Sequence, residues 1–310
     1  MENWDLIIIG AGAAGLAAGI YGSRSGLKTL IIEEKMAGGA TSDAPTVENY
    51  PGFPQIAGAE LAEKMVLHCK KTGVALHDLE TVATLDLKGE KKIVKTNRSE
   101  YEAVAVLIAT GAHYREMGVK GEKEFRGRGV SYCGVCDGPF FKGKRVIVVG
   151  GGNSACTTTL YLSGLAAEVV VVHRRDAFRA EDALVKDLMS KGNVKIFWNT
   201  EIKEIKGEKT VKTVVLYDTK TQKTQELPVD GVFVQIGESP NSQLAKESDV
   251  EVEEEGRIKI DIRQRTNIPG VYAAGDVTNH PVKQIGVAVG QGITAALEAY
   301  AYIKRPYYRK

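Results

Sequence analysis

Two glycine-rich turns constrain the fold of this chain more than any other feature of its sequence. The first turn, residues 10–15, follows the apolar run Trp4–Ile9 and precedes a helix that we expect from Leu16 to Ser25. The second turn, residues 150–155, follows a strand expected over 144–149 and precedes a helix expected over 153–163. A buried strand, a glycine turn and a helix in this order predict a βαβ unit. The sequence therefore predicts an α/β protein with two such units.

The first turn has the spacing Gly10-x-Gly12-x-x-Gly15. Gly10 permits the tight turn, Gly12 lets the backbone approach a pyrophosphate, and Gly15 lets the helix pack closely on the strand. The next strand, residues 28–32, ends at Glu33, where an acid can bond a ribose hydroxyl. The spacing alone is weak, but with strand, helix and acid in place it predicts a bound dinucleotide. An acid at this position suits a free 2′-hydroxyl, as in FAD or NAD, and repels a 2′-phosphate.

The second turn has the opposite charge at the ribose position. It begins with Gly150 and Gly152 and has Ala155 in the third place, and the strand that follows, 168–172, runs into the basic segment His173–Arg179. The arginines of this segment can neutralise a 2′-phosphate and bond its oxygens with both arms of the guanidinium. The alternative is a solvated basic turn. Because the arginines follow a glycine turn at the right distance, we favour NADP(H), and two turns of opposite charge then predict two different dinucleotides.

Two cysteines with two residues between them, Cys133 and Cys136, lie just before the second βαβ unit, and Asp137 follows them. At a helix N-terminus such a pair can close as a disulfide or open to a thiol and a thiolate, and an adjacent acid can move the proton. Half of a zinc site is the alternative, but zinc needs four ligands, and the other cysteines, Cys69 and Cys156, are isolated. We therefore expect a redox dithiol and no metal. Cys133 is expected at the solvent-facing start of the helix, with Cys136 one turn further in.

Composition and charge limit the number of domains, the classes of partner and the compartment that we expect. The chain has 310 residues, which suits about two domains, and a formal net charge of +2, so nothing indicates a nucleic acid partner. No apolar run approaches the roughly 18 residues needed to cross a membrane. The first residues lead straight into a strand without the pattern of a signal peptide. A Cys-x-x-Cys with so few other cysteines fits a reducing compartment, and we expect a cytoplasmic protein.

Further elements follow from apolar periodicity. The glycine-punctuated segment Met36–Phe53 has no clear period, and a loop of this length inside a domain is usually functional. The pattern predicts a helix from about Gly58 to Thr72 and a C-terminal helix from about Gln284 to Ile303. Strands are expected within 74–106 and over 104–109, 168–172, 194–198, 213–217, 230–237 and 270–277, and a helix over 181–190.

Taken together, these residues resemble the low-molecular-weight thioredoxin reductases. The motifs occur in the family's order and span nearly the whole chain. They are Gly10-x-Gly12-x-x-Gly15, Glu48-Asn49-Tyr50-Pro51-Gly52, Ala109-Thr110-Gly111, Cys133-x-x-Cys136-Asp137-Gly138, Gly150-x-Gly152-x-x-Ala155, His173-Arg174-Arg175-x-x-x-Arg179 and Tyr272-Ala273-Ala274-Gly275-Asp276. The dithiol is Cys-Gly-Val-Cys where Cys-Ala-Thr-Cys is usual. Two other departures are Cys156-Thr157, where an acidic pair is common, and Gly237-Glu238-Ser239-Pro240 after the last strand of the second unit.

The resemblance implies two Rossmann-like domains, the second inserted into the first. Residues 1–112 and 241–310 would form the FAD domain, and 113–240 the NADPH domain that carries the dithiol. The links near 112 and 240 would be hinges about which the inserted domain rotates. Cys136 would lie next to the flavin, Cys133 would attack the disulfide of thioredoxin, and Asp137 would be the acid and base. The family is usually dimeric, so a homodimer is expected.

The resemblance also assigns cofactor contacts to positions of this sequence. The FAD set is Gly10, Gly12, Ala14, Gly15, Glu33, Gly39, Asn49, Ala109, Gly111, Gly275, Asp276 and Gln284. The NADPH set is Gly150, Gly152, Asn153, Ser154, Ala155, His173, Arg174, Arg175 and Arg179.

The implied activity is the reduction of thioredoxin, or of a glutaredoxin-like protein, by NADPH through FAD and the Cys133–Cys136 dithiol. One rival is a flavin-dependent dithiol oxidase, which needs no NADPH site, so that Arg174, Arg175 and Arg179 weigh against it. Another is a flavin-binding redox sensor, which rapid turnover with NADPH and a disulfide would exclude.

Overall fold

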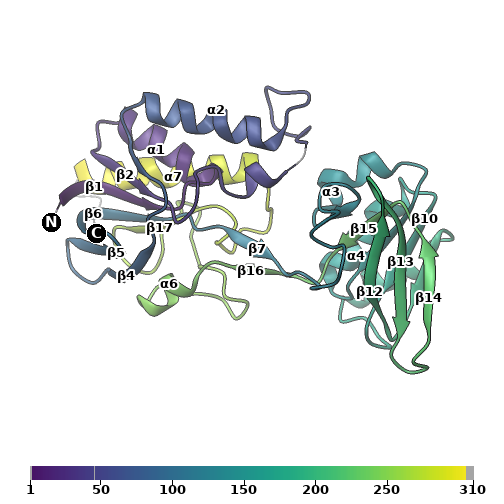
Figure 1. Cartoon of the computed structure of the whole chain (residues 1–310). Coiled ribbons are helices and arrows are strands. Elements are labelled where there is room, and N and C mark those ends of the chain that lie inside the picture. Colours follow the sequence, from purple (N-terminus) through teal and green to yellow (C-terminus); the bar gives the residue numbers. More distant parts are fainter. Residues whose placement is uncertain (1, 45, 305–310) are drawn as a thin grey trace. The chain divides into compact units, whose positions relative to one another are not determined.

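The computed structural model describes residues 2–44 and 46–304 (Figure 1). The chain divides into two compact units, one formed by Met1–His113 with Ser239–Lys310 and the other by Tyr114–Glu238. It passes between them twice, at the short strands β7 (Ala112–Tyr114) and β16 (Glu238–Pro240), which pair with each other. The mixed α/β architecture, with a large sheet containing parallel strands in each unit, confirms the predicted fold class.

The first unit is built on a seven-stranded sheet with β1 (Glu2–Ile9) near its centre. Strand β1 pairs in parallel with β2 (Thr29–Ile32) on one side and β6 (Glu100–Ile108) on the other. The second half of β6 pairs with β17 (Val271–Ala273), so the segment after residue 240 returns to the sheet that the N-terminal segment began. The remaining strands are β3 (Ala75–His77), β4 (Val82–Asp86) and β5 (Lys92–Thr96).

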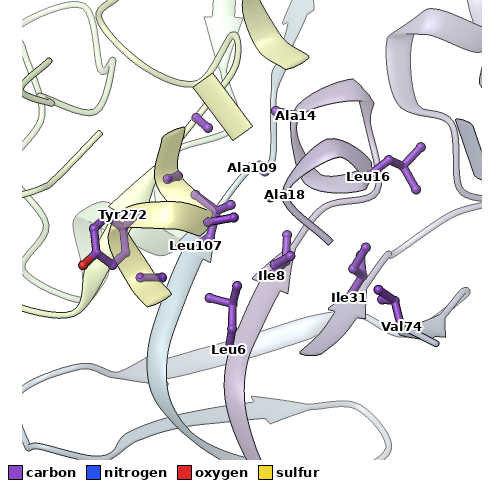
Figure 2. Close-up of a cluster of buried hydrophobic side chains, with 14 of the residues drawn as sticks. Leu6, Ile8, Ala14, Leu16, Ala18, Ile31, Val74, Leu107, Ala109 and Tyr272 are labelled. Atoms are coloured by element: carbon purple, nitrogen blue, oxygen red, sulfur yellow. The ribbon is translucent and has the colours of Figure 1, made fainter. Parts of the chain in front are cut away.

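Successive side chains of the buried strands point to opposite faces of this sheet, and apolar residues cover both faces. Leu6, Ile8 and Leu107 point to one face, where they meet apolar residues of the helices (Figure 2). Their neighbours Ile7 and Ile9 face a second cluster on the other side. Burial on both faces is why β1 is a continuous apolar run. The helices of the unit are α1 (Ala13–Arg24), α2 (Gly58–Lys71), α6 (Gln243–Glu247), α7 (Ile285–Lys304) and the 3-10 turn η1 (Gly39–Asp43).

The second unit has a five-stranded parallel sheet in the order β11-β10-β9-β15-β8. Its central strand β9 (Arg145–Val149) pairs with β10 (Glu168–Val172) and β15 (Gly231–Val234). The other elements of this sheet and its helices are β8 (Val130–Ser131), β11 (Val194–Phe197), α3 (Gly134–Asp137), η2 (Gly138–Phe141), α4 (Asn153–Ser163) and α5 (Asp182–Met189).

An antiparallel sheet of three strands completes the second unit. The strands are β12 (Thr200–Gly207), β13 (Val211–Asp218) and β14 (Thr224–Pro228). Only the central one was expected from the sequence. Within the described residues, no helix combines the length and the apolar character that crossing a membrane requires.

Candidate dinucleotide and dithiol sites

The first glycine turn is shaped by close backbone contacts. Gly10 has φ +104°, and a Cβ on it would lie 2.4 Å from the carbonyl oxygen of Ala109. A Cβ on Gly15 would lie 1.9 Å from the carbonyl oxygen of Gly10. Both positions therefore require glycine, because any side chain would collide with backbone atoms that cannot rotate away.

Gly12 differs from its two neighbours in the motif because the space beside it is open. A Cβ there would meet only the Cα of Gly39, at 3.9 Å. Gly12 is also the N-cap of α1, and no side chain caps this helix end. The first amide groups of α1 thus face an open space with the positive end of the helix dipole, which is the arrangement that binds a pyrophosphate.

Glu33, at the end of β2, is held by two backbone amides. One carboxylate oxygen accepts the N–H of Ala11 at 2.7 Å, and the other accepts the N–H of Lys35 at 2.9 Å. A carboxylate can accept about four hydrogen bonds, so acceptor sites remain for a ribose hydroxyl. The side chain is therefore fixed next to the glycine turn, at the place that the sequence predicted for a ribose contact.

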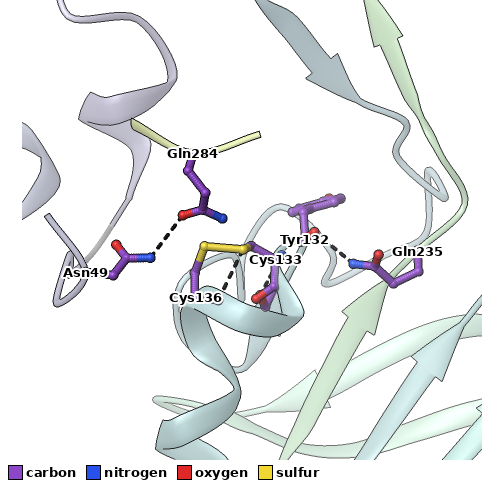
Figure 3. The surroundings of a disulfide bond; sticks show 7 residues. Asn49, Tyr132, Cys133, Cys136, Gln235 and Gln284 are labelled. Carbon is purple, nitrogen blue, oxygen red and sulfur yellow. Dashed lines mark hydrogen bonds between the residues drawn. A yellow bond between two sulfur atoms is a disulfide. The ribbon is translucent and has the colours of Figure 1, made fainter. Parts of the chain in front are cut away.

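Other residues of the predicted FAD set gather around this turn. Gly39 lies against Gly12, Ala109 against Gly10, and Ala14 against Gly275. Gly275 and Gly111 have positive φ angles, +81° and +67°. Asn49 donates to the side-chain oxygen of Gln284 at 3.0 Å, just before α7 (Figure 3). Asp276 is partly buried directly after Gly275.

The second glycine turn repeats this geometry. Gly150 has φ +149°, and a Cβ on it would lie 2.2 Å from the carbonyl oxygen of Gln235. A Cβ on Gly152 would have no neighbour within 4 Å, and Gly152 caps α4 without a side-chain bond. Ala155, in the third place, is fully buried against Gly150. This turn can therefore also receive a pyrophosphate.

His173 lies beneath this turn, not on its surface. The residue is 5% exposed, and its ring occupies the space where a Cβ of Gly151 would lie. It stacks on Phe178, and its Nε2–H donates to the carbonyl oxygen of Ala177 at 3.0 Å. Burial lowers the pKa of His173, the hydrogen bond to Ala177 offsets part of that shift, and the nearby arginines lower the pKa further. These contacts make His173 a support of the turn and do not favour the predicted direct contact with NADPH.

The three arginines, in contrast, are exposed beside the turn. The backbone N–H of Arg179 donates to the carbonyl oxygen of Gly151 at 2.7 Å, which ties the basic segment to the glycine turn. Arg174, Arg175 and Arg179 all lie near enough to His173 to depress its pKa. None of the three forms an ion pair with another residue in 2–44 or 46–304. The segment thus offers three unneutralised guanidinium groups.

Asn153 and Ser154 begin α4 in different environments. Asn153 exchanges two hydrogen bonds with Glu181, each of 2.9 Å, through its amide nitrogen and oxygen. Its side chain thereby joins the start of α4 to the start of α5. Ser154 is exposed at the same helix end.

The dithiol is closed as a Cys133–Cys136 disulfide with a Cα–Cα distance of 5.3 Å (Figure 3). Cys133 is the N-cap of α3, and its sulfur accepts the backbone N–H of Cys136 at 3.2 Å. The predicted order of exposure is wrong, since Cys136 is exposed and Cys133 is partly buried. Gly134, next to Cys133, is buried against Thr158, whereas Val135 and Cys136 lie on the exposed side of the short helix α3.

Asp137 lies next to the disulfide in a partly buried position. Burial raises the pKa of Asp137, and a hydrogen bond from Ser131 offsets part of that rise. A carboxyl with a raised pKa carries a proton at higher pH than an exposed one, as an acid and base of thiol exchange requires. Ser131 was not predicted. Its Oγ also accepts the N–H of Cys133 at 3.1 Å.

Two more residues that were not predicted shape the dithiol turn. Gln235, at the end of β15, donates its side-chain amide to the carbonyl oxygen of Tyr132 at 2.8 Å (Figure 3). Thr158 of α4 packs against Gly134, where a Cβ would lie 2.5 Å from its Cγ2. Gly134 is the position at which alanine is usual, so the threonine explains why this chain has glycine there. No sequence pattern signals either contact, because both join distant segments.

This contact predicts that Gly134→Ala destabilises the protein. The new methyl group would overpack the joint between α3 and α4, at a cost of about 1–3 kcal/mol in the free energy of unfolding. Urea unfolding measures the change, and Thr158→Ser, which removes the nearest methyl group, should restore most of the loss. Gly164→Ala is the matched control, because its Cβ would only reach Tyr161 at an ordinary 3.5 Å. Equal effects at the two glycines would contradict the explanation.

Comparison with known proteins agrees with this geometry. The family model of the pyridine nucleotide-disulphide oxidoreductases matches residues 4–292. A thioredoxin reductase of Bacillus subtilis is 45% identical over 304 residues, which are 97% of this chain and 95% of the relative. A thioredoxin reductase of Treponema pallidum is 42% identical over 302 residues, which are 97% of each chain. The crystal structure of thioredoxin reductase from Streptococcus pyogenes superposes with a TM-score of 0.94 at 40% identity, covering 97% of this chain and 98% of that one. The chain therefore belongs to the pyridine nucleotide-disulphide oxidoreductase family, an enzyme family that works with a flavin and a pyridine nucleotide.

Proposed function

We propose that this protein is a thioredoxin-disulfide reductase that takes electrons from NADPH through FAD. The observation that carries the proposal is the Cys133–Cys136 disulfide with Asp137 beside it, in the unit that also holds the second glycine turn and the free arginines. Several similar proteins are thioredoxin reductases, and that supports thioredoxin as the partner. The chain itself also has residues suited to each step: a glycine turn for each dinucleotide, arginines for a 2′-phosphate, and a dithiol with an adjacent acid.

FAD fits the first unit. The opening beside Gly12 accepts the pyrophosphate, and the fixed carboxylate of Glu33 accepts bonds from an unphosphorylated ribose. A flavin supplies the chemistry that side chains lack, since it accepts a hydride and passes the electrons to a disulfide. The residues that would hold it are those that gather around the first glycine turn.

NADPH fits the second unit. Three arginines lie beside the open glycine turn without ionic partners among the described residues: Arg174, Arg175 and Arg179. A 2′-phosphate can therefore form charge-assisted hydrogen bonds with them without breaking an existing ion pair. NADH lacks that phosphate and leaves the arginines solvated. NADPH is therefore the proposed electron donor.

Thiol exchange follows once the disulfide has been reduced. The Cys133 thiolate attacks the disulfide of thioredoxin, so that a mixed disulfide forms and one thioredoxin thiolate leaves. The Cys136 thiolate then attacks the sulfur of Cys133, which restores the disulfide and releases the second thioredoxin thiolate. Asp137, whose pKa is raised, is placed to give the proton that a leaving thiolate takes up.

No contact in the described residues favours the dithiol oxidase or the redox sensor over the reductase. The oxidase would leave the three free arginines without a role, and rapid turnover with NADPH and a disulfide would exclude the sensor. A homodimer, a glutaredoxin-like partner and a cytoplasmic location stay predictions.

The test is thioredoxin reduction with each nicotinamide cofactor. The wild-type protein should use NADPH far better than NADH. Arg174→Ala with Arg175→Ala should raise the KM for NADPH by roughly tenfold to a hundredfold for each guanidinium lost, and change the KM for NADH little. Lys212→Ala, which removes an exposed charge elsewhere in the unit, is the control. Equal changes for both cofactors would refute the assignment of the arginines to the 2′-phosphate.

A further inference from the structure

A buried carboxylate outside the sites described above holds together three segments of the first unit. Glu80 is 2% exposed. It accepts hydrogen bonds from Thr96 Oγ1 at 2.6 Å and Tyr101 OH at 2.9 Å, and its second oxygen lies 3.1 Å from His77 Nδ1. These partners come from β5, β6 and β3. No step of the proposed reaction uses this cluster.

The cluster favours the ionised form of Glu80. Burial pushes the pKa of this carboxyl up, but the hydrogen bonds from Thr96 and Tyr101 and the contact with His77 outweigh it, so the pKa lies below its usual value. A buried charge with several donors is costly to disturb, because removing a donor leaves the charge short of partners. Glu80 is therefore a firm anchor for the segment in which it lies.

That segment, residues 77–80, is paired with the segment that carries Glu33. The N–H of Glu33 donates to the carbonyl oxygen of His77 at 2.9 Å, and the N–H of Glu80 donates to the carbonyl oxygen of Glu33 at 2.9 Å. Further along, the N–H of Leu79 donates to the carbonyl oxygen of Lys35 at 3.1 Å, and Asp78 accepts the N–H of Ala37 at 2.9 Å. Both backbone groups of Glu33 are thus bound to this one segment.

The side chains of the segment offer little other anchorage. Leu79 is 55% exposed and has φ +57°, a conformation that is unfavourable for leucine. Asp78 is partly buried, and the ring of His77 is itself one of the contacts of Glu80. Backbone pairing of β3 with β2 holds the start of this segment in the sheet, and the carboxylate of Glu80 ties its other end to β5 and β6.

We propose that Glu80 is a positioning residue for the ribose-binding acid Glu33. Its carboxylate, tied to Thr96, Tyr101 and His77, fixes the 77–80 segment, and that segment fixes the backbone on both sides of Glu33. The carboxylate of Glu33 is then held ready for the ribose of the adenosine half of FAD, which lowers the entropy that binding must overcome. This inference rests on the proposed binding of FAD in the first unit.

The test measures how fast FAD leaves the purified holoprotein. Free FAD is captured by an excess of a flavin-binding apoprotein, and the release rate is followed by fluorescence. Glu80→Gln keeps the size of the side chain but removes its charge, and it should speed release by about tenfold, the equivalent of one weakened hydrogen bond to the ribose. Tyr101→Phe, which removes a single donor, should have a smaller effect in the same direction and serves if Glu80→Gln folds poorly.

A double-mutant cycle separates positioning from general destabilisation. If Glu80 acts through Glu33, the double variant Glu33→Gln with Glu80→Gln should release FAD no faster than Glu33→Gln alone. Lys92→Met is the matched control, because Lys92 is also 2% exposed but bonds the carbonyl oxygens of Leu87 and Gly89, away from Glu33. It should lower stability and leave the release rate unchanged.

Three results would overturn the inference: an unchanged release rate in Glu80→Gln, multiplicative effects of the two glutamate substitutions, or a rate increase in Lys92→Met as large as that in Glu80→Gln. A wild-type protein that binds no FAD would be a different failure, because it would refute the proposed function itself.

Discussion

Cys136→Ser should trap thioredoxin in a stable mixed disulfide, and Cys133→Ser should trap none. In Cys136→Ser the remaining thiol, Cys133, can attack the disulfide of thioredoxin, but no second thiol is present to resolve the product. Turnover should fall to background in both variants, because each removes one half of the exchange. The trapped adduct is measured as a band of higher mass on a non-reducing gel, and it should disappear with dithiothreitol.

The structure gives a physical reason for this division, although not the one that the sequence suggested. Exposure does not favour Cys133, because Cys136 is the more exposed of the two. Instead, the sulfur of Cys133 accepts the N–H of Cys136 at 3.2 Å at the start of α3. In the reduced protein that donor would stabilise a thiolate on Cys133, and the thiolate is the attacking species.

Flavin reduction is the internal control for these two variants. Both should still bleach their flavin absorbance when NADPH is added, because that step comes before the dithiol. By the family resemblance, Cys133→Ser should also show a long-wavelength band from the Cys136 thiolate beside the oxidised flavin. Trapping by Cys133→Ser and not by Cys136→Ser would show that the two roles are exchanged. Full thioredoxin reduction by either variant would remove the dithiol from the mechanism.

Helices and strands with strong local sequence signals could be predicted from the sequence. Residues 153–163 and 168–172 were predicted with the bounds that α4 and β10 have, because a glycine turn fixes where the one begins and a run of valines defines the other. Strands β12 and β14 were missed. They lie at the two edges of the antiparallel sheet, and their many polar and charged side chains obscure the apolar alternation on which the prediction relies.

Some residues of the candidate sites could likewise be predicted from the sequence, and others could not. Glycine turns, the dithiol and the arginines are contiguous motifs, and the sequence therefore displays them. Thr158 and Glu80 act through partners that only the fold brings near, so no spacing identifies them. His173 shows that a place in a motif does not by itself indicate a side chain's surroundings, because the fold packs it beneath Gly151; its contact with NADPH stays a prediction.

Substitution of the middle glycine in each turn should separate the two proposed cofactors. Gly12 and Gly152 have ordinary φ angles, −78° and −99°, and their Cβ positions are open, so the fold can accept valine at both. The cost to each helix N-cap is about 1 kcal/mol, which most proteins survive. The valine side chain, however, fills the space that a pyrophosphate needs, and it pushes the phosphate away from the helix N-terminus.

Gly12→Val should therefore yield a folded but colourless protein, and Gly152→Val a yellow protein that NADPH can no longer reduce. The ratio of flavin absorbance to protein absorbance measures the first result, and flavin bleaching by NADPH in a stopped-flow instrument measures the second. Gly15→Ala is the contrasting control, because its Cβ would lie 1.9 Å from the carbonyl oxygen of Gly10 and should unfold the first unit itself. If Gly12→Val kept a full complement of flavin, the first turn would not be the pyrophosphate site. If Gly152→Val lost flavin while Gly12→Val kept it, the two units would have to exchange their cofactors, and the charge of Glu33 and of the arginines would need another explanation.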